Sequence, residues 1–119
     1  MEYDIQSDAS NDLGACAAAA AFAALGSEVR LGILRQLVRA GPEGLAVGAI
    51  QDRLGIAAST LSHHIRALTG AGVLIQTREG RILNCHADFN RISALAGFLI
   101  SECCVDSPGE MEGIEREAS

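Results

Sequence analysis

The chain has 119 residues, which suits one domain with one hydrophobic core and is too short for an elaborate enzyme cleft. Aromatic residues make up 3% of it and Trp is absent, so the core must consist of aliphatic side chains, which favours packed helices over a sheet sandwich. The net charge of −6 argues at first against a nucleic-acid partner. Its distribution reverses that argument, because residues 22–100 carry eight Arg against five acidic residues, a net charge of +3.

The acidic residues gather at the two ends of the chain. We therefore expect flexible tails at residues 1–14 and 105–119, on either side of one domain over residues 15–104. The apolar run Ala15–Leu25 is too short to span a bilayer and follows acidic rather than basic residues, so no membrane association is expected. Four cysteines without a secretory context predict a cytoplasmic protein with reduced thiols.

Apolar periodicity predicts a mainly α fold with a two-stranded β-hairpin. Four helices are expected first, at residues 15–25, 28–39, 45–54 and 57–69. Ser27 can cap the second of these, whose apolar face is Val29, Ile33, Leu34 and Leu37. Strands at 73–77 and 81–86 flank a tight turn at Glu79-Gly80, and a last helix is expected from Asp88 to Cys104, with an apolar stripe of Ile92, Leu95, Ala96 and Leu99. This is the order of a winged helix-turn-helix.

The helix at 57–69 has two chemically different sides. Leu61, Ile65 and Leu68 define its buried side, and His64 lies near that edge, where a packed residue is expected. The exposed side carries Ser59, Thr60, Ser62, His63 and Arg66. These side chains suit phosphates and base edges, and Arg78 and Arg81 of the hairpin could reach phosphates or the minor groove. The alternative is an ordinary solvated helix face, against which the hairpin downstream argues.

Three segments resemble the ArsR/SmtB family of metalloregulatory repressors. Residues 59–68 read STLSHHIRAL and residues 71–74 read AGVL, as in the family's recognition helix and its continuation. Residues 24–34 (ALGSEVRLGIL) resemble the family's opening motif, and residues 78–81 (REGR) its wing tip. The resemblance implies a homodimer built from the first and last helices, which binds an imperfect palindrome of double-stranded operator DNA and leaves it when an inducer binds.

The metal sites of the family are not carried over. Residues 44–49 (GLAVGA) lack the Cys and acid of the family's third-helix metal box, and Asp88 lacks the His partners of its last-helix zinc site. Ala57 stands where the family often has a capping Ser. No catalytic cofactor is expected.

The adjacent pair Cys103 and Cys104 resembles that of arsenic-responsive members of the family. Thiolates without a nearby His or carboxylate cluster favour soft, thiophilic ions, so the expected inducer is trivalent arsenic, as arsenite or a methyl or phenyl arsenical, or antimonite. Neighbouring helical side chains diverge by about 100°, so one ion can hold both sulfurs only if the helix end unwinds. A third ligand could come from Cys85 or Cys16, although Cys85 is better explained as a small buried hydrophobe.

Three other functions stay open from the sequence. The same fold could act as a thiol redox sensor, or as a winged-helix module that binds proteins instead of DNA. An enzyme is the weakest of these, because the chain has no phosphate-cradling Gly loop and no paired carboxylates, and because the adjacent Cys85 and His86 point to opposite faces of a strand.

Overall fold

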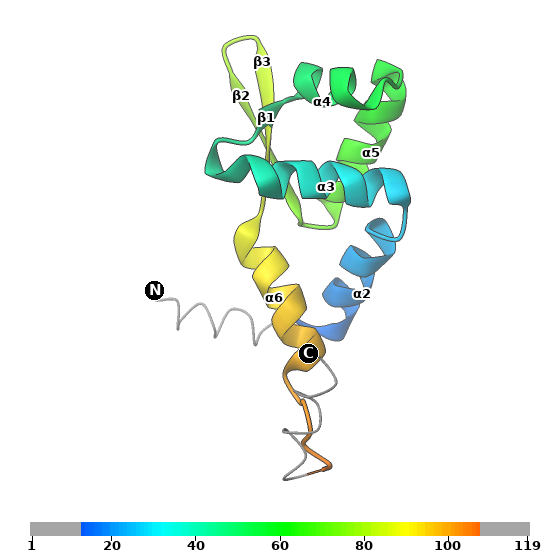
Figure 1. Cartoon of the computed structure of the whole chain (residues 1–119), viewed down its shortest axis with the longest axis vertical. Coiled ribbons are helices and arrows are strands. Elements are labelled where there is room, and N and C mark those ends of the chain that lie inside the picture. Colours follow the sequence, from blue (N-terminus) through cyan, green and yellow to red (C-terminus); the bar gives the residue numbers. More distant parts are fainter. Residues whose placement is uncertain (1–12, 108–119) are drawn as a thin grey trace.

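The computed structural model describes residues 13–107, so the predicted tails at 1–14 and 105–119 lie outside the described residues except for 13–14 and 105–107. In chain order the elements are α2 (Ala15–Ala24), α3 (Glu28–Ala40), the short 3₁₀ helix η1 (Gly41–Glu43), β1 (Leu45–Ala46), α4 (Val47–Leu54), α5 (Ala58–Gly70), β2 (Leu74–Glu79), β3 (Ile82–Ala87) and α6 (Phe89–Ile100). This is the winged helix-turn-helix order predicted from the sequence. In Figure 1, α3, α4, α5 and the strands form one body, from which α2 and α6 extend away from the hairpin tip.

The sheet has three strands rather than the predicted two, in the order β1-β3-β2. Leu45 and Ala46, predicted as the start of a helix, instead pair antiparallel with Cys85 and Asn84 of β3. Gly44 directs the chain into this pairing with a φ of 69°, and its Cα lies so close to the Cys85 carbonyl that a Cβ could not fit. The helix prediction was wrong for these two residues because their partner strand lies far along the chain.

The hairpin closes through a two-residue turn, Gly80-Arg81, because Glu79 still pairs with Ile82. Gly80 has a φ of 67°, the left-handed conformation that such turns require. β2 therefore extends two residues beyond its predicted end at 77, β3 is shifted by one residue, and the turn lies one residue later than Glu79-Gly80.

The last helix ends at Ile100, four residues before the predicted end at Cys104. Residues 101–106 form turns, and Cys104 has a φ of 64°. Leu99 and Ile100 are 66% and 67% exposed, so the final turn gains no packing within one protomer that would extend the helix.

The core lies between α3, α5 and the base of the sheet and extends along one side of α2 and α6. Its fully buried large side chains are Ile33, Leu37, Ile50, Leu61, Leu68, Leu74, Val73 and Cys85. Three predicted core positions are wrong in a single protomer: Val29 is 39% exposed in the first turn of α3, Ala96 is exposed on α6, and Leu99 projects beyond the core. Within the described residues no single helix is long and apolar enough to span a membrane, although the bent pair Ala15–Ala24 and Glu28–Glu43 meets the length and composition criteria jointly.

Candidate nucleic-acid interface and cysteine pair

Helix α5 separates a packed side from an exposed polar side, as the sequence predicts. Leu61, Ile65 and Leu68 are buried against the core. All five side chains predicted to contact DNA from this helix are exposed: Ser59, Thr60, Ser62, His63 and Arg66. Ala57 occupies the N-cap without a side-chain hydrogen bond, so the first turn of α5 is uncapped. The exposed side thus carries hydroxyl, imidazole and guanidinium groups, which are of the kind that contact base edges and phosphates in a DNA groove.

The turn between α4 and α5 sets the angle at which α5 is presented. Gly55 ends α4 in the left-handed conformation, with a φ of 67°, and its amide donates to the Gln51 carbonyl at 2.8 Å. The Gln51 side-chain amide then donates to the carbonyl of Ile56 at 3.2 Å. These two bonds fix both sides of the turn, so α4 and α5 form a defined helix-turn-helix unit.

The wing, which is the hairpin formed by β2 and β3, turns one of its faces towards α5. Gln76 pairs with Cys85 and Arg78 with Leu83, which places Gln76, Arg78 and Leu83 on the same face of the hairpin. Arg78 and the turn residue Arg81 are both exposed, as predicted for contacts with phosphates. Arg66 of α5 adds a third exposed cation to this side of the molecule.

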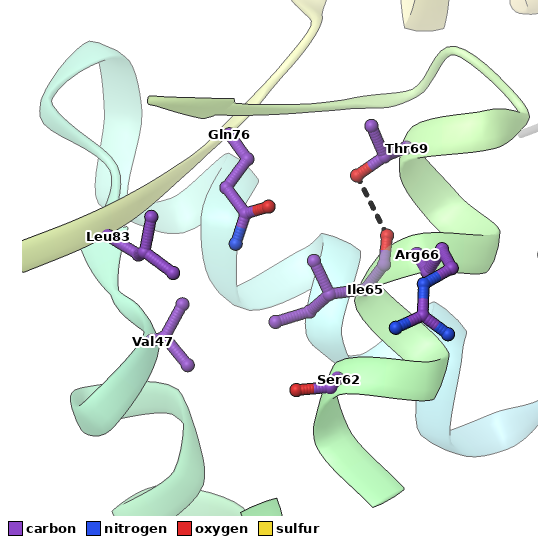
Figure 2. A pocket seen from close by; sticks show the side chains of 7 residues that line it. All are labelled: Val47, Ser62, Ile65, Arg66, Thr69, Gln76 and Leu83. Carbon is purple, nitrogen blue, oxygen red and sulfur yellow. Dashed lines mark hydrogen bonds between the residues drawn. The ribbon is translucent and has the colours of Figure 1, made fainter. Parts of the chain in front are cut away.

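An open cleft of about 260 Å³ lies between the start of α4, helix α5 and the wing. Figure 2 shows Gln76 and Leu83 of the wing across the cleft from Ile65 and Ser62 of α5, with Arg66 at its edge. Val47 and Thr69 complete the lining, and the Thr69 hydroxyl donates to the Ile65 carbonyl at 2.8 Å. An apolar floor with a polar and cationic rim suits a sugar–phosphate strand. Sequence reasoning missed Thr69 and Gln76, although Gln76 lies two residues before Arg78 on the same strand face.

His64 takes the packed position expected of it. Arg30, in the first turn of α3, donates from Nε to Nδ1 of His64 at 3.1 Å. Burial, followed by the charges of Arg30 and His63, lowers the pKa of His64. The imidazole is thus held neutral as an acceptor that ties α5 to α3, while His63 beside it faces solvent. Nothing in the sequence pattern pointed to Arg30 as the partner.

The structure brings the two sulfurs of Cys103 and Cys104 together. Their Sγ atoms lie 3.4 Å apart, both thiols are free, and Cys103 is exposed. The unwinding that a shared ion requires is already present, because α6 ends at Ile100 and Cys104 adopts a left-handed φ. The hydrogen bond with Cys103, with smaller contributions from burial and from the Cys103 charge, raises the pKa of Cys104.

The other two cysteines lie in different environments. Cys85 is fully buried, and that burial raises the pKa of its thiol to about 11, as expected of the small packed hydrophobe favoured from the sequence. Cys16 is exposed in the first turn of α2. Within residues 13–107 no three His, Cys, Asp or Glu side chains cluster as a metal site. Within the described part of one protomer, the candidate site therefore has two sulfurs.

Comparison with known proteins supports this description of the fold. Residues 25–77 match a sequence family described as a helix-turn-helix domain. An ArsR-like transcriptional regulator from Rhodococcus sp. RHA1 is similar in structure, with a TM-score of 0.65 and 22% identity over 87% of this chain and 94% of that one. No curated protein sequence matches the chain significantly.

Two further solved structures share the fold. The homodimeric winged helix-turn-helix DNA-binding domain of a possible ArsR-family regulator from Mycobacterium bovis has a TM-score of 0.57 and 29% identity over 72% of this chain and 80% of that one. A possible transcriptional regulator for arsenical resistance has a TM-score of 0.58 and 19% identity over 81% and 93% of the two chains.

The three-helix core, the exposed α5 and the adjoining hairpin define this chain as a winged helix-turn-helix domain. The solved structures that it resembles include ArsR-family transcriptional regulators, in agreement with the resemblance seen in the sequence, and the chain shares their fold.

Proposed function

We propose that this protein is a transcriptional repressor that binds a palindromic operator as a homodimer and leaves it when trivalent arsenic binds Cys103 and Cys104. The observation that carries the proposal is the 3.4 Å distance between the Sγ atoms of Cys103 and Cys104, which lie just beyond the last turn of α6. A regulator needs a reading surface and a sensor. The first is α5 with its wing, and the second is this pair of thiols.

The reading surface supports major-groove binding. A recognition helix places its N-terminal residues against base edges, which here are Ser59, Thr60, Ser62 and His63. Arg66, Arg78 and Arg81 would neutralise phosphates on either side. All contacts through cations must come from Arg, since the chain contains no Lys.

The homodimer follows from apolar side chains that one protomer leaves uncovered. Phe98, Leu99 and Ile100 of α6 are 38%, 66% and 67% exposed, and Phe22 of α2 is 37% exposed. Both helices extend from the DNA-reading body at its far end (Figure 1). A two-fold contact through α2 and α6 would cover these side chains and set two α5 helices against successive major grooves.

The chemistry of the sensor favours trivalent arsenic over zinc. A bond to sulfur of about 2.3 Å gives a sulfur–sulfur distance of about 3.3 Å at a right angle and about 3.8 Å at a tetrahedral angle. Trivalent arsenic is pyramidal with angles near 90°, and the observed 3.4 Å lies between the two distances, so a small movement of the thiols suits either ion and the number of ligands decides. Two sulfurs satisfy a monosubstituted arsenical, in which the third bond holds a methyl or phenyl group. Structural zinc requires four ligands.

A thiol redox sensor is the second candidate, because the same two sulfurs could form a disulfide of about 2.05 Å after a small movement. It would need an oxidant, such as a peroxide, to accept two electrons while two protons leave the thiols. Both candidates keep the DNA-binding role. They differ only in what alters the end of α6.

The test is a fluorescence anisotropy titration on the promoter upstream of the protein's own gene. Arsenite, phenylarsenite, antimonite, zinc and cadmium are added in turn to reduced wild type and to Cys103→Ser/Cys104→Ser, with Cys16→Ser as a matched control at an exposed thiol. We expect phenylarsenite to release DNA from wild type and from the control, and not from the double variant. Release by zinc alone, or by arsenicals from the double variant, contradicts the proposal.

Two further arms separate the alternatives. Peroxide treatment without arsenic identifies a redox sensor if it releases DNA as fully as phenylarsenite does. The variant His63→Ala/Arg66→Ala should lose operator binding. If this variant retains operator binding, the exposed side of α5 does not read DNA, and this side is then better explained as a surface that binds a protein partner.

A further inference from the structure

The first turn of α6 is fastened to the end of α5. Arg91 of α6 donates from Nη1 to the carbonyl of Ala71, the residue that caps α5, at 3.5 Å. The backbone amide of Asp88 donates to the Val73 carbonyl at 2.9 Å, and the Asp88 side chain accepts the Arg91 amide at 3.1 Å. Two hydrogen bonds thus join the start of α6 to residues 71–73, and the third caps the first turn of α6, which holds Arg91.

Gly72 makes room for this contact. Its φ is 85°, and a Cβ there would lie 2.7 Å from Nη1 and 3.0 Å from Cζ of Arg91. The guanidinium therefore packs directly against the glycine backbone, in space that any other residue would fill. The requirement for glycine at this position is both conformational and steric.

The contact also supplies a charge that α5 lacks. The last turn of α5 contains no basic residue, although the negative end of its dipole lies there. The Arg91 guanidinium takes that place from another helix and satisfies the Ala71 carbonyl at the end of α5. The carbonyl of Ala71, at the end of α5, is thus capped by α6.

We propose that Arg91 is the positioning residue through which α6 sets the orientation of α5 and transmits the state of the cysteine pair to the DNA-reading surface. This inference rests on the function proposed above. The twelve residues of α6 span about 18 Å, with Arg91 in its first turn and Cys103 and Cys104 just past its last. A rigid helix carries a shift at one end to the other, where the fork of Arg91 contacts α5.

The test compares Arg91→Ala and Arg91→Lys with Asn90→Ala, an exposed neighbour on the same turn. The measured quantity is the coupling factor, the ratio of operator Kd with and without phenylarsenite. We expect Arg91→Ala to reduce this factor to within about twofold of 1, where functional couplings are about 5-fold to 150-fold. Arg91→Lys keeps the positive charge but loses the planar guanidinium, and its coupling factor should lie between those of wild type and Arg91→Ala. Asn90→Ala should match wild type.

Phenylarsenite binding by each variant, followed through thiol absorbance, should equal that of wild type, because the sulfurs are untouched. Unfolding curves show whether each variant is folded. If Arg91→Ala does not fold, the coupling factor of Arg91→Lys tests the inference in its place. A coupling factor in Arg91→Ala equal to that of wild type overturns the inference and leaves the proposed function standing.

Hydrogen exchange gives a readout that needs neither DNA nor arsenic. The amides of Ala71, Gly72 and Val73 donate to Ala67, Thr69 and Leu68 carbonyls, and these bonds should open more often without the guanidinium. Exchange at these amides should rise at least about fivefold in Arg91→Ala and stay unchanged in Asn90→Ala. Unchanged exchange in Arg91→Ala overturns the positioning role even if wild type binds no operator.

Discussion

Arg30 Nε lies 3.1 Å from Nδ1 of His64 and joins the first turn of α3 to the middle of α5. The guanidinium can only donate, so Nδ1 must accept and the imidazole must be neutral. His63, whose ring centroid lies 5.8 Å from that of His64, faces solvent. Two adjacent histidines on one helix therefore have different tasks: His64 anchors α5 from within, and His63 is available to a ligand.

This anchor makes stability depend on pH. Burial is the first cause that lowers the pKa of His64 below its ordinary 6.5, so the unfolded chain takes up a proton at a higher pH than the folded one does. The contribution of His64 to the free energy of unfolding should be complete above pH 6.5. It should be lost progressively as the pH falls from 6.5 towards the lowered pKa. Urea unfolding from about pH 8 to pH 5 measures this slope.

The variant His64→Asn keeps an acceptor for Arg30 but cannot titrate, so it should flatten the slope. His63→Asn, the exposed neighbour, should leave most of the slope in place. Equal slopes in wild type and His64→Asn would show that another group causes the pH dependence.

Arg66 should act on DNA affinity through phosphate rather than base contacts, because it lies at the edge of the cleft between α5 and the wing. Arg66→Ala should weaken binding to operator and to unrelated DNA by the same factor. It should also lower the slope of log K against log salt by about 2 for a dimer, one contact per protomer. Arg39→Ala, an exposed arginine in the last turn of α3, is the charge-matched control. A loss confined to operator DNA would instead assign Arg66 to base readout.

The sequence predicted those parts of the fold whose signals are local. The apolar spacing of α5 predicted its buried side, and Ser27 caps α3 as expected, accepting the Arg30 amide at 3.3 Å. Gly80 likewise indicated the hairpin turn. In each case the deciding interaction lies within a few residues of the signal.

The features that the sequence did not predict depend on distant partners. Leu45–Ala46 forms a strand only because β3 lies beside it, and apolar periodicity alone cannot distinguish so short a strand from a helix start. The early end of α6 has the same kind of cause, because an apolar stripe predicts a helix only where something packs against it. The partners of His64 and of Gln76 were not predictable for this reason either: each contact joins two elements, and no periodicity reports it.

The exposed end of α6 predicts the effect of a charge at the proposed dimer contact. Leu99→Asp should raise the dimer dissociation constant at least about 100-fold, because a carboxylate would be buried without a partner. Analytical ultracentrifugation measures this directly. Ile82→Asp, which alters a 55% exposed apolar residue on the wing, is the matched control and should remain as dimeric as wild type. A Leu99→Asp protein that stays dimeric would place the interface elsewhere.

Proton balance at the cysteine pair distinguishes arsenic from divalent metals. The hydrogen bond with Cys103 raises the pKa of Cys104 above its ordinary 9.0, so this thiol is protonated near neutral pH. A divalent ion must displace that proton, and its affinity should fall about tenfold per pH unit on acidification, or about 100-fold if both thiols release protons.

A phenylarsonous acid, PhAs(OH)₂, instead reacts with two thiols to give PhAs(SR)₂ and two waters, with no net proton released. Its affinity should therefore vary by less than about threefold between pH 8 and pH 6, while that of cadmium collapses. Calorimetry in two buffers of different ionisation enthalpy counts the protons. An arsenical affinity that rises about tenfold or more per pH unit on acidification would mean that protons are consumed and that the reacting sulfurs are already thiolates, against the hydrogen-bonded thiol pair described here.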